Sequence, residues 1–167
     1  MYRTIAIAVI FATSVLAVAD LSRQDRAFIR AAGQGGVFEV VSNGIGVRKA
    51  RITEVKQHSK VMVRDHGKGN KELAALAARE GVRTPASMSA KQSAMVGRLR
   101  RLSGISFDRE HARQQVLAHK EAVALFKKEA AAGRDARLKA WAAGKVPLLE
   151  MHGQMWGRAL GELERGK

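Results

Sequence analysis

The fold of this chain is decided by residues 53–80, which read TEVKQHSKVMVRDHGKGNKELAALAARE. From Ile52 onward, mostly apolar or small residues, with one histidine among them, recur at intervals of three and four: Ile52, Val55, Ser59, Met62, His66, Gly69, Leu73 and Leu76. This spacing places them on one face of an α-helix, because a helix turns once every ~3.6 residues. Gly81 and Pro85 follow, and both residue types are typical of helix ends. The stretch therefore predicts one long helix that buries one face.

The same spacing continues through the rest of the chain and predicts four more helices, at residues 21–49, 89–102, 108–132 and 135–163. Thr53, Asp108 and Asp135 are expected to begin helices, because their side chains can accept the free backbone N–H groups of a first turn. Pro147 lies inside the last predicted helix and should kink or break it. Glycines at five positions within 33–46 suggest a close approach of neighbouring helices. We expect an all-α, up-down four-helix bundle with an additional short helix.

The N-terminal residues, 1–19, have the features of a signal peptide. Arg3 precedes an uncharged apolar run, and Ala17-Val18-Ala19 gives the small-x-small pattern at which signal peptidase cuts. A membrane anchor is the alternative, but the run is short for a span of ~20 residues. We therefore expect an exported protein, periplasmic or associated with the outer membrane, with one helical domain at 20–167. No later stretch is apolar enough to be expected to span a bilayer.

The charge of the chain predicts its class of partner. Lys and Arg number 30 against 15 Asp and Glu, which gives a formal net charge of +15. This favours anionic envelope surfaces, meaning lipid headgroups or acidic glycans. Aromatic residues make up only 5% of the chain, so base stacking is poorly supported and no specific nucleic-acid motif is present. The absence of cysteine excludes disulfides and thiolate metal ligands.

A candidate site emerges from the buried faces. Each of the four long predicted helices carries one ionisable residue near mid-length on that face: Glu39, His66, His119 and His152. Glu39 lies 14 residues before Thr53 and His66 lies 13 after it, so antiparallel helices joined there would bring the two side by side. Three imidazoles and a carboxylate form a ligand set suited to zinc, iron, manganese or copper. The sequence thus predicts a possible divalent metal site in the core.

A purely architectural polar layer explains the same four residues, because a carboxylate and imidazoles can satisfy one another by hydrogen bonds. His58 and His111 lie off the buried faces. Asp65 is adjacent to His66 and is expected to point elsewhere, into solvent. The Glu-x-x-His pairs of di-iron bundles are missing, and so are nucleophile and phosphate-loop motifs. These absences favour a non-catalytic protein, with a metal-dependent oxidase or hydrolase as a weaker alternative.

Several short blocks, in order along the chain, resemble one bacterial envelope family: DRAF at 25–28, GGVFE at 35–39, MVRDH at 62–66, NKEL at 70–73, LSG at 102–104, FD at 107–108, QVLAH at 115–119 and PLLEMH at 147–152. This is the family called domain of unknown function 4142, often labelled putative outer membrane protein. The resemblance covers residues 20–165 and implies an exported, ferritin-like helical bundle with no established activity. Its typical positions fall on Glu39, His66, His119 and His152. His111 departs from the pattern, since the family usually has tyrosine there.

Two functions are consistent with these observations. The first is an exported bundle that binds a metal ion in its core, for metal handling or protection of the envelope under stress. The second is a non-catalytic, basic structural or binding protein that attaches to anionic envelope surfaces and has a purely architectural polar core. Metal content and the salt dependence of surface binding would distinguish the two.

Overall fold

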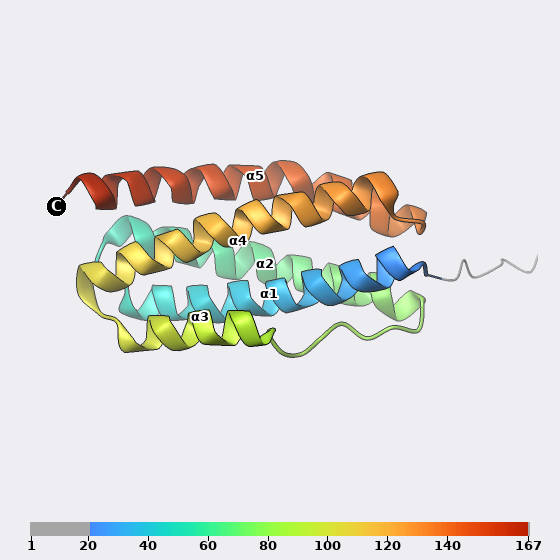
Figure 1. Ribbon diagram of the computed structural model, residues 1–167, viewed down its shortest axis with the longest axis horizontal. Helices are drawn as coiled ribbons and strands as arrows, with labels where there is room; N and C mark the ends of the chain where they lie inside the picture. Colours follow the sequence, from blue (N-terminus) through green and yellow to red (C-terminus); the bar gives the residue numbers. More distant parts are fainter. Residues whose placement is uncertain (1–20, 167) are drawn as a thin grey trace, which may run out of the picture.

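The computed structural model of the protein describes residues 21–166. Helices dominate this range (Figure 1) and are bounded as follows: α1 (Arg23–Lys49), α2 (Thr53–Arg79), α3 (Ala90–Arg101), α4 (Gly104–Ala132) and α5 (Ala136–Arg165). The predicted all-α helical bundle with one short extra helix is therefore confirmed. The predicted leader, residues 1–19, lies outside the described residues.

The bundle consists of two antiparallel helical hairpins, α1–α2 and α4–α5, which pack side by side with α1 against α4 and α2 against α5 (Figure 1). α2 and α4 run in the same direction, so the chain has to return along the bundle between them. Residues 80–89 and α3 form this crossover, and α3 packs against α1 and α4. One long crossover between two hairpins is the connection found in ferritin-like bundles.

The ends of the helices show why the chain turns where it does. Ser22 and Asp25 form a reciprocal capping box at the start of α1, and Ser89 starts α3 in the same way with Gln92. Asp135 begins α5 as predicted, because its carboxylate accepts the backbone N–H of Leu138 across 2.8 Å.

Two of the predicted helix starts are wrong. Thr53 is already helical, and the N-cap of α2 is Ile52, without a side-chain hydrogen bond. Asp108 lies inside α4 rather than at its start, and its carboxylate accepts the backbone N–H of Ile52 across 2.8 Å, so it satisfies the turn before α2 instead. Pro147 does not break α5, which continues on both sides of it.

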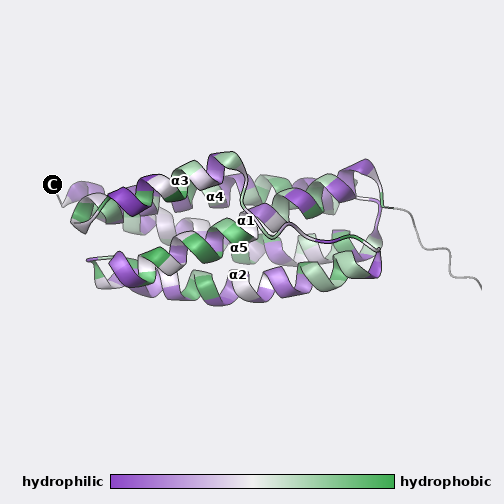
Figure 2. Ribbon diagram, turned by 90° about the horizontal axis from the view of Figure 1, so that it is seen from below, coloured by the Kyte–Doolittle hydropathy of each residue, from purple (hydrophilic) through white to green (hydrophobic). Residues whose placement is uncertain are grey.

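The core divides into two apolar clusters along the bundle axis. One, at the end where α1 turns into α2, is built around Phe38, Met62, Phe107 and Trp156. The other, towards the start of α1, is built around Phe28 and Leu73 among others. Figure 2 shows hydrophobic and hydrophilic residues interleaved along all the helices, as expected for helices that bury one face. No helix within residues 21–166 is long and apolar enough to cross a membrane.

Some of the glycines of α1 stand where a neighbouring segment comes close, as predicted. A Cβ at Gly36 would lie 2.7 Å from Cγ of Asn70, and one at Gly46 would lie 2.7 Å from Nε2 of His111. Contacts this short do not occur, so a larger residue at either position would force the facing side chains to move. Gly35 and Gly44 differ, because a Cβ at either position would meet none of the described atoms closer than 3.7 Å.

Candidate metal centre

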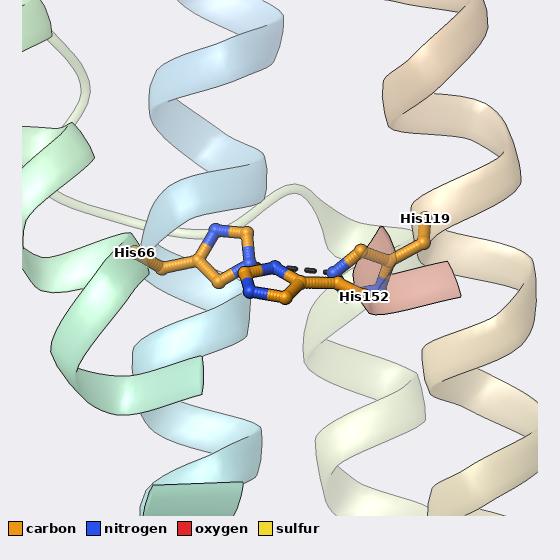
Figure 3. A group of neighbouring side chains, drawn as sticks. All are labelled: His66, His119 and His152. Carbon is orange, nitrogen blue, oxygen red and sulfur yellow. Dashed lines mark hydrogen bonds between the residues drawn. The ribbon is translucent and has the colours of Figure 1, made fainter. Parts of the chain in front are cut away.

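Three histidines from three helices meet in the middle of the bundle: His66 from α2, His119 from α4 and His152 from α5 (Figure 3). One ring nitrogen of each lies within 4.8 Å of those of the other two. Nε2 of His66 and Nε2 of His119 are only 3.4 Å apart. The helical spacing read from the sequence placed all three on buried faces, and the structure brings them together.

Glu39 lies beside this trio rather than within it. Its Oε2 is 4.0 Å from Nε2 of His66 and accepts a hydrogen bond of 2.9 Å from the side-chain amide of Asn43. Gln115 of α4 in turn accepts a hydrogen bond from the same amide across 3.1 Å. The predicted set of four is therefore a close group of three histidines, with the carboxylate next to His66.

The orientation of His119 is fixed from behind. Its Nδ1 lies 2.9 Å from the backbone carbonyl oxygen of Gln115, one turn earlier in α4. A carbonyl only accepts, so Nδ1 carries the proton of the neutral ring and Nε2 keeps its lone pair. That lone pair is on the nitrogen nearest to His66. A backbone carbonyl behind a ring nitrogen is the arrangement that commonly orients histidine ligands of metals.

The orientation of His152 is fixed by a carboxylate. Its Nε2 donates to Oδ2 of Asp65 across 3.1 Å, and Arg64 donates to the other oxygen of the same carboxylate across 2.7 Å. The lone pair of the neutral ring is then on Nδ1, which is buried and has no hydrogen-bond partner among the described residues. The expectation that Asp65 points into solvent is wrong. Neighbouring helical positions differ by only ~100°, so a residue flanking the buried face can still reach an adjacent helix.

Burial controls the charge of the cluster. Burial, together with repulsion from the neighbouring imidazoles, lowers the pKa of His66 to about 3 and that of His119 to about 4, although the hydrogen bond to Gln115 opposes the shift of His119. Burial also lowers the pKa of His152, although Asp65 opposes this. Burial would raise the pKa of Asp65, but its hydrogen bonds with Arg64 and His152 outweigh that effect and lower it. At neutral pH the cluster therefore presents three uncharged imidazoles, and without an ion the lone pair of His119 accepts a hydrogen bond from Nε2 of His66 (Figure 3).

Glu39 behaves in the opposite way to Asp65. Burial raises its pKa to about 8, and hydrogen bonds from Gln115 and Asn43 only partly oppose the shift. At neutral pH its carboxyl group is mostly protonated. The two carboxyl groups of the centre therefore differ: Asp65 is an ionised acceptor for His152, and Glu39 is neutral beside His66.

A cavity of about 390 Å³ adjoins the cluster. It runs between α1, α2, α4 and α5, and residues from the start of α3 complete its wall. The three histidines and Glu39 lie at one end of the segments that line it, and Trp141, Phe126 and Leu73 lie towards the other end. The histidines thus stand at one end of a space large enough for a small molecule.

One further buried histidine, outside the three of the centre, was not predicted from the sequence. His111 of α4 is fully buried, and its Nε2 is 3.2 Å from Oγ of Ser59, whose hydroxyl donates to the carbonyl oxygen of Val55. His111 stacks on Phe107 and meets the edge of Trp156. It lies off the predicted line of α4 because α1, α3 and α5 all pack against this helix and bury a wider face. His111 is a packing residue outside the trio.

The fold and the site together define an all-helical bundle with a buried histidine cluster at mid-length. The family described as "Domain of unknown function (DUF4142)" matches residues 11–158, and the protein belongs to this family. Neither the curated proteins nor the solved structures contain a significant match to the chain.

Proposed function

We propose that the protein binds a divalent transition-metal ion through His66, His119 and His152. The observation that carries this proposal is the 3.4 Å separation of Nε2 of His66 and Nε2 of His119. Two imidazole nitrogens that share a tetrahedral zinc ion, each at ~2.0–2.1 Å, lie about 3.3 Å apart. The third histidine requires only a small closing movement, since its nitrogen is within 4.8 Å of the others.

The chemistry of the donors supports the same proposal. Three neutral imidazoles suit zinc, copper and iron, and the carboxyl group of Glu39, which would have to lose its proton to bind, widens the choice to manganese. The lone pair of His152 on Nδ1 lacks a hydrogen-bond partner within residues 21–166, and a buried polar atom without a partner is costly unless something fills that role. A bound ion would polarise a ligand in an open coordination position. We propose metal handling in the cell envelope as the role.

The test is the metal content of the purified protein, measured by mass spectrometry without an affinity tag of histidines or a chelator during purification. The wild type should contain or take up close to one equivalent of ion, and His66→Ala and His119→Ala should lose it. His58→Ala is the matched control, because His58 is on the same helix as His66 but outside the trio. If no metal is retained by the wild type, and added zinc, iron, manganese or copper does not raise its melting temperature, the cluster is an architectural polar layer.

Export is the second part of the proposal, and it rests on the sequence of residues 1–19. The protein isolated from cells should begin at Asp20 and be found in the periplasmic or outer-membrane fraction. N-terminal sequencing and cell fractionation measure both. A chain that keeps its first nineteen residues and stays in the cytoplasm would contradict this part without affecting the metal site.

Attachment to an anionic envelope surface is a second candidate function, supported by the net charge of +15 and by the exposed arginines at the end of α3: Arg98, Arg100 and Arg101. Binding to vesicles that contain anionic lipid should then fall steeply as salt rises, because exposed charges are screened. Replacing these arginines by glutamine should weaken vesicle binding, whereas His119→Ala should not. Binding that is independent of salt would count against this candidate.

A further inference from the structure

The cavity beside the histidines extends from the interior of the bundle to its surface, where the exposed Lys91 and Glu121 line it. Side chains in a protein core normally pack to the density of organic crystals and leave few voids larger than a water molecule. An engineered apolar cavity of roughly 150 Å³ already takes up benzene. The volume of about 390 Å³ here is within the range of small-molecule binding sites.

Two glycines keep this space open. Gly35 of α1 and Gly69 of α2 both line the cavity, and a Cβ at either position would meet no described atom within 4 Å. A glycine inside a helix costs about 1 kcal/mol relative to alanine. At Gly36 a close helix contact accounts for that cost, but nothing packs against Gly35 or Gly69. The absence of a side chain at Gly35 and Gly69 leaves space in the cavity.

The walls of the cavity determine what would fit. The apolar wall is mostly aliphatic, and Phe38, Phe126 and Trp141 supply its aromatic part. Trp141 and Phe126 pack together with ring centroids 5.4 Å apart, which gives a rigid aromatic wall. This surface favours a flat, apolar body.

The charges around the cavity are already neutralised. Lys91 and Glu121 pair across 2.7 Å, and Lys145 pairs with Glu72 across 2.6 Å. A charged ligand would lose its hydration without gaining a free partner in this lining. The polar end of the cavity is formed by the three imidazoles, of which that of His66 is partly exposed while those of His119 and His152 are buried.

We infer that the cavity is a binding site for a neutral aromatic molecule of one or two rings, whose single polar head is an azole N–H or a phenol O–H directed at the histidines. The ring body lies along Phe126, Trp141 and Leu149, and the head donates its proton to an imidazole lone pair. This inference goes beyond the metal site and concerns the metal-free protein, in which the lone pairs that an ion would occupy can accept a hydrogen bond from the head. The bundle would then bind an organic ligand in its interior, and metal binding does not depend on that ligand.

The probe is 4-phenylimidazole, and the comparison compound is imidazole, which has the same polar head but lacks the phenyl ring. Both are titrated calorimetrically into the purified wild-type protein in the presence of EDTA, so that the outcome does not depend on metal. We expect 4-phenylimidazole to bind at least tenfold more tightly than imidazole, because the phenyl ring is buried in the cavity. Equal affinities, or no binding of 4-phenylimidazole at millimolar concentration, would overturn the inference.

Substitution of the two glycines locates the binding. Gly69→Leu places a side chain in the cavity without altering a histidine and should weaken 4-phenylimidazole binding at least tenfold. Gly67→Leu is the matched control, since Gly67 is on the same helix, has no described neighbour within 4 Å of its Cβ position and does not line the cavity. Gly35→Leu repeats the test from α1 should Gly69→Leu fail to fold. An equal loss in Gly67→Leu, or undiminished binding in a folded Gly35→Leu or Gly69→Leu protein, would place the ligand elsewhere.

Discussion

His152 and Asp65 form a hydrogen bond of 3.1 Å between α5 and α2, and this bond decides which nitrogen of His152 holds the lone pair. Asp65 contributes no ligand atom to the trio, but it fixes the tautomer and the orientation of a ring that does. The first prediction concerns this bond.

Asp65→Asn should weaken metal binding by about 10–100-fold and leave the fold intact. The amide is a poorer acceptor and can also donate, so it no longer holds the proton of His152 on Nε2. Competition with a chromophoric chelator measures the affinity, and circular dichroism checks the fold. Glu72→Gln is the control, because Glu72 is also a paired carboxylate of α2 but accepts from Lys145 and Trp141 instead. Unchanged affinity in Asp65→Asn would remove Asp65 from the centre.

His111→Ala should lower the free energy of unfolding by about 2–5 kcal/mol, the range for emptying a buried site of similar size. His111 is fully buried between Phe107 and Trp156 and makes a hydrogen bond to Ser59. Its metal content should equal that of the wild type, since it lies outside the trio. Urea unfolding measures the first quantity and mass spectrometry the second. If His111→Ala is as stable as the wild type but has lost its metal, His111 is a metal ligand and not a packing residue.

Stability should fall as the pH falls below about 6.5. Burial lowers the pKa of His111 from 6.5 to about 3, so the unfolded chain takes up a proton over this range and the folded protein does not. The stabilisation by neutral His111 is therefore complete above pH 6.5 and is lost progressively down to about pH 3, at up to about 1.4 kcal/mol per pH unit. Metal-free protein is unfolded in urea at a series of pH values. His111→Gln, which cannot titrate, should show a shallower dependence, and an identical slope would contradict this assignment.

Gly44→Ala and Gly46→Ala should change stability in opposite directions. A Cβ at Gly44 meets only the end of the Arg48 side chain at 3.7 Å, so alanine should stabilise α1 by up to about 1 kcal/mol. A Cβ at Gly46 would collide with Ser59 and with His111, so alanine there should cost about 1–3 kcal/mol. Thermal melting of the two variants gives the comparison. Stabilisation by both substitutions would mean that α1 and α2 can separate at no cost.

The periodicity of the sequence predicted the helices and the meeting of the three histidines, because burial on one face of each long helix leaves a pattern of 3.6 residues. It did not predict Asp65 or His111, which stand one helical position away from that pattern. Their burial depends on how many neighbours a helix has: α4 packs against α1, α3 and α5 and so buries more than one line of residues. The role of Asp108 could not be predicted either. Its carboxylate accepts hydrogen bonds from the backbone N–H groups of Arg51 and Ile52, which are remote from it in sequence.

The trio takes His66 from one helical hairpin and both His119 and His152 from the other. Each hairpin can form from contacts close in sequence, but the centre exists only after the two have docked. An ion held there would act as a cross-link between hairpins that are joined in the chain only by residues 80–89 and α3. Such a cross-link, made after the hairpins have come together, would slow their separation and leave the rate of docking nearly unchanged. The ion would then determine how long the bundle stays closed more than how quickly it forms.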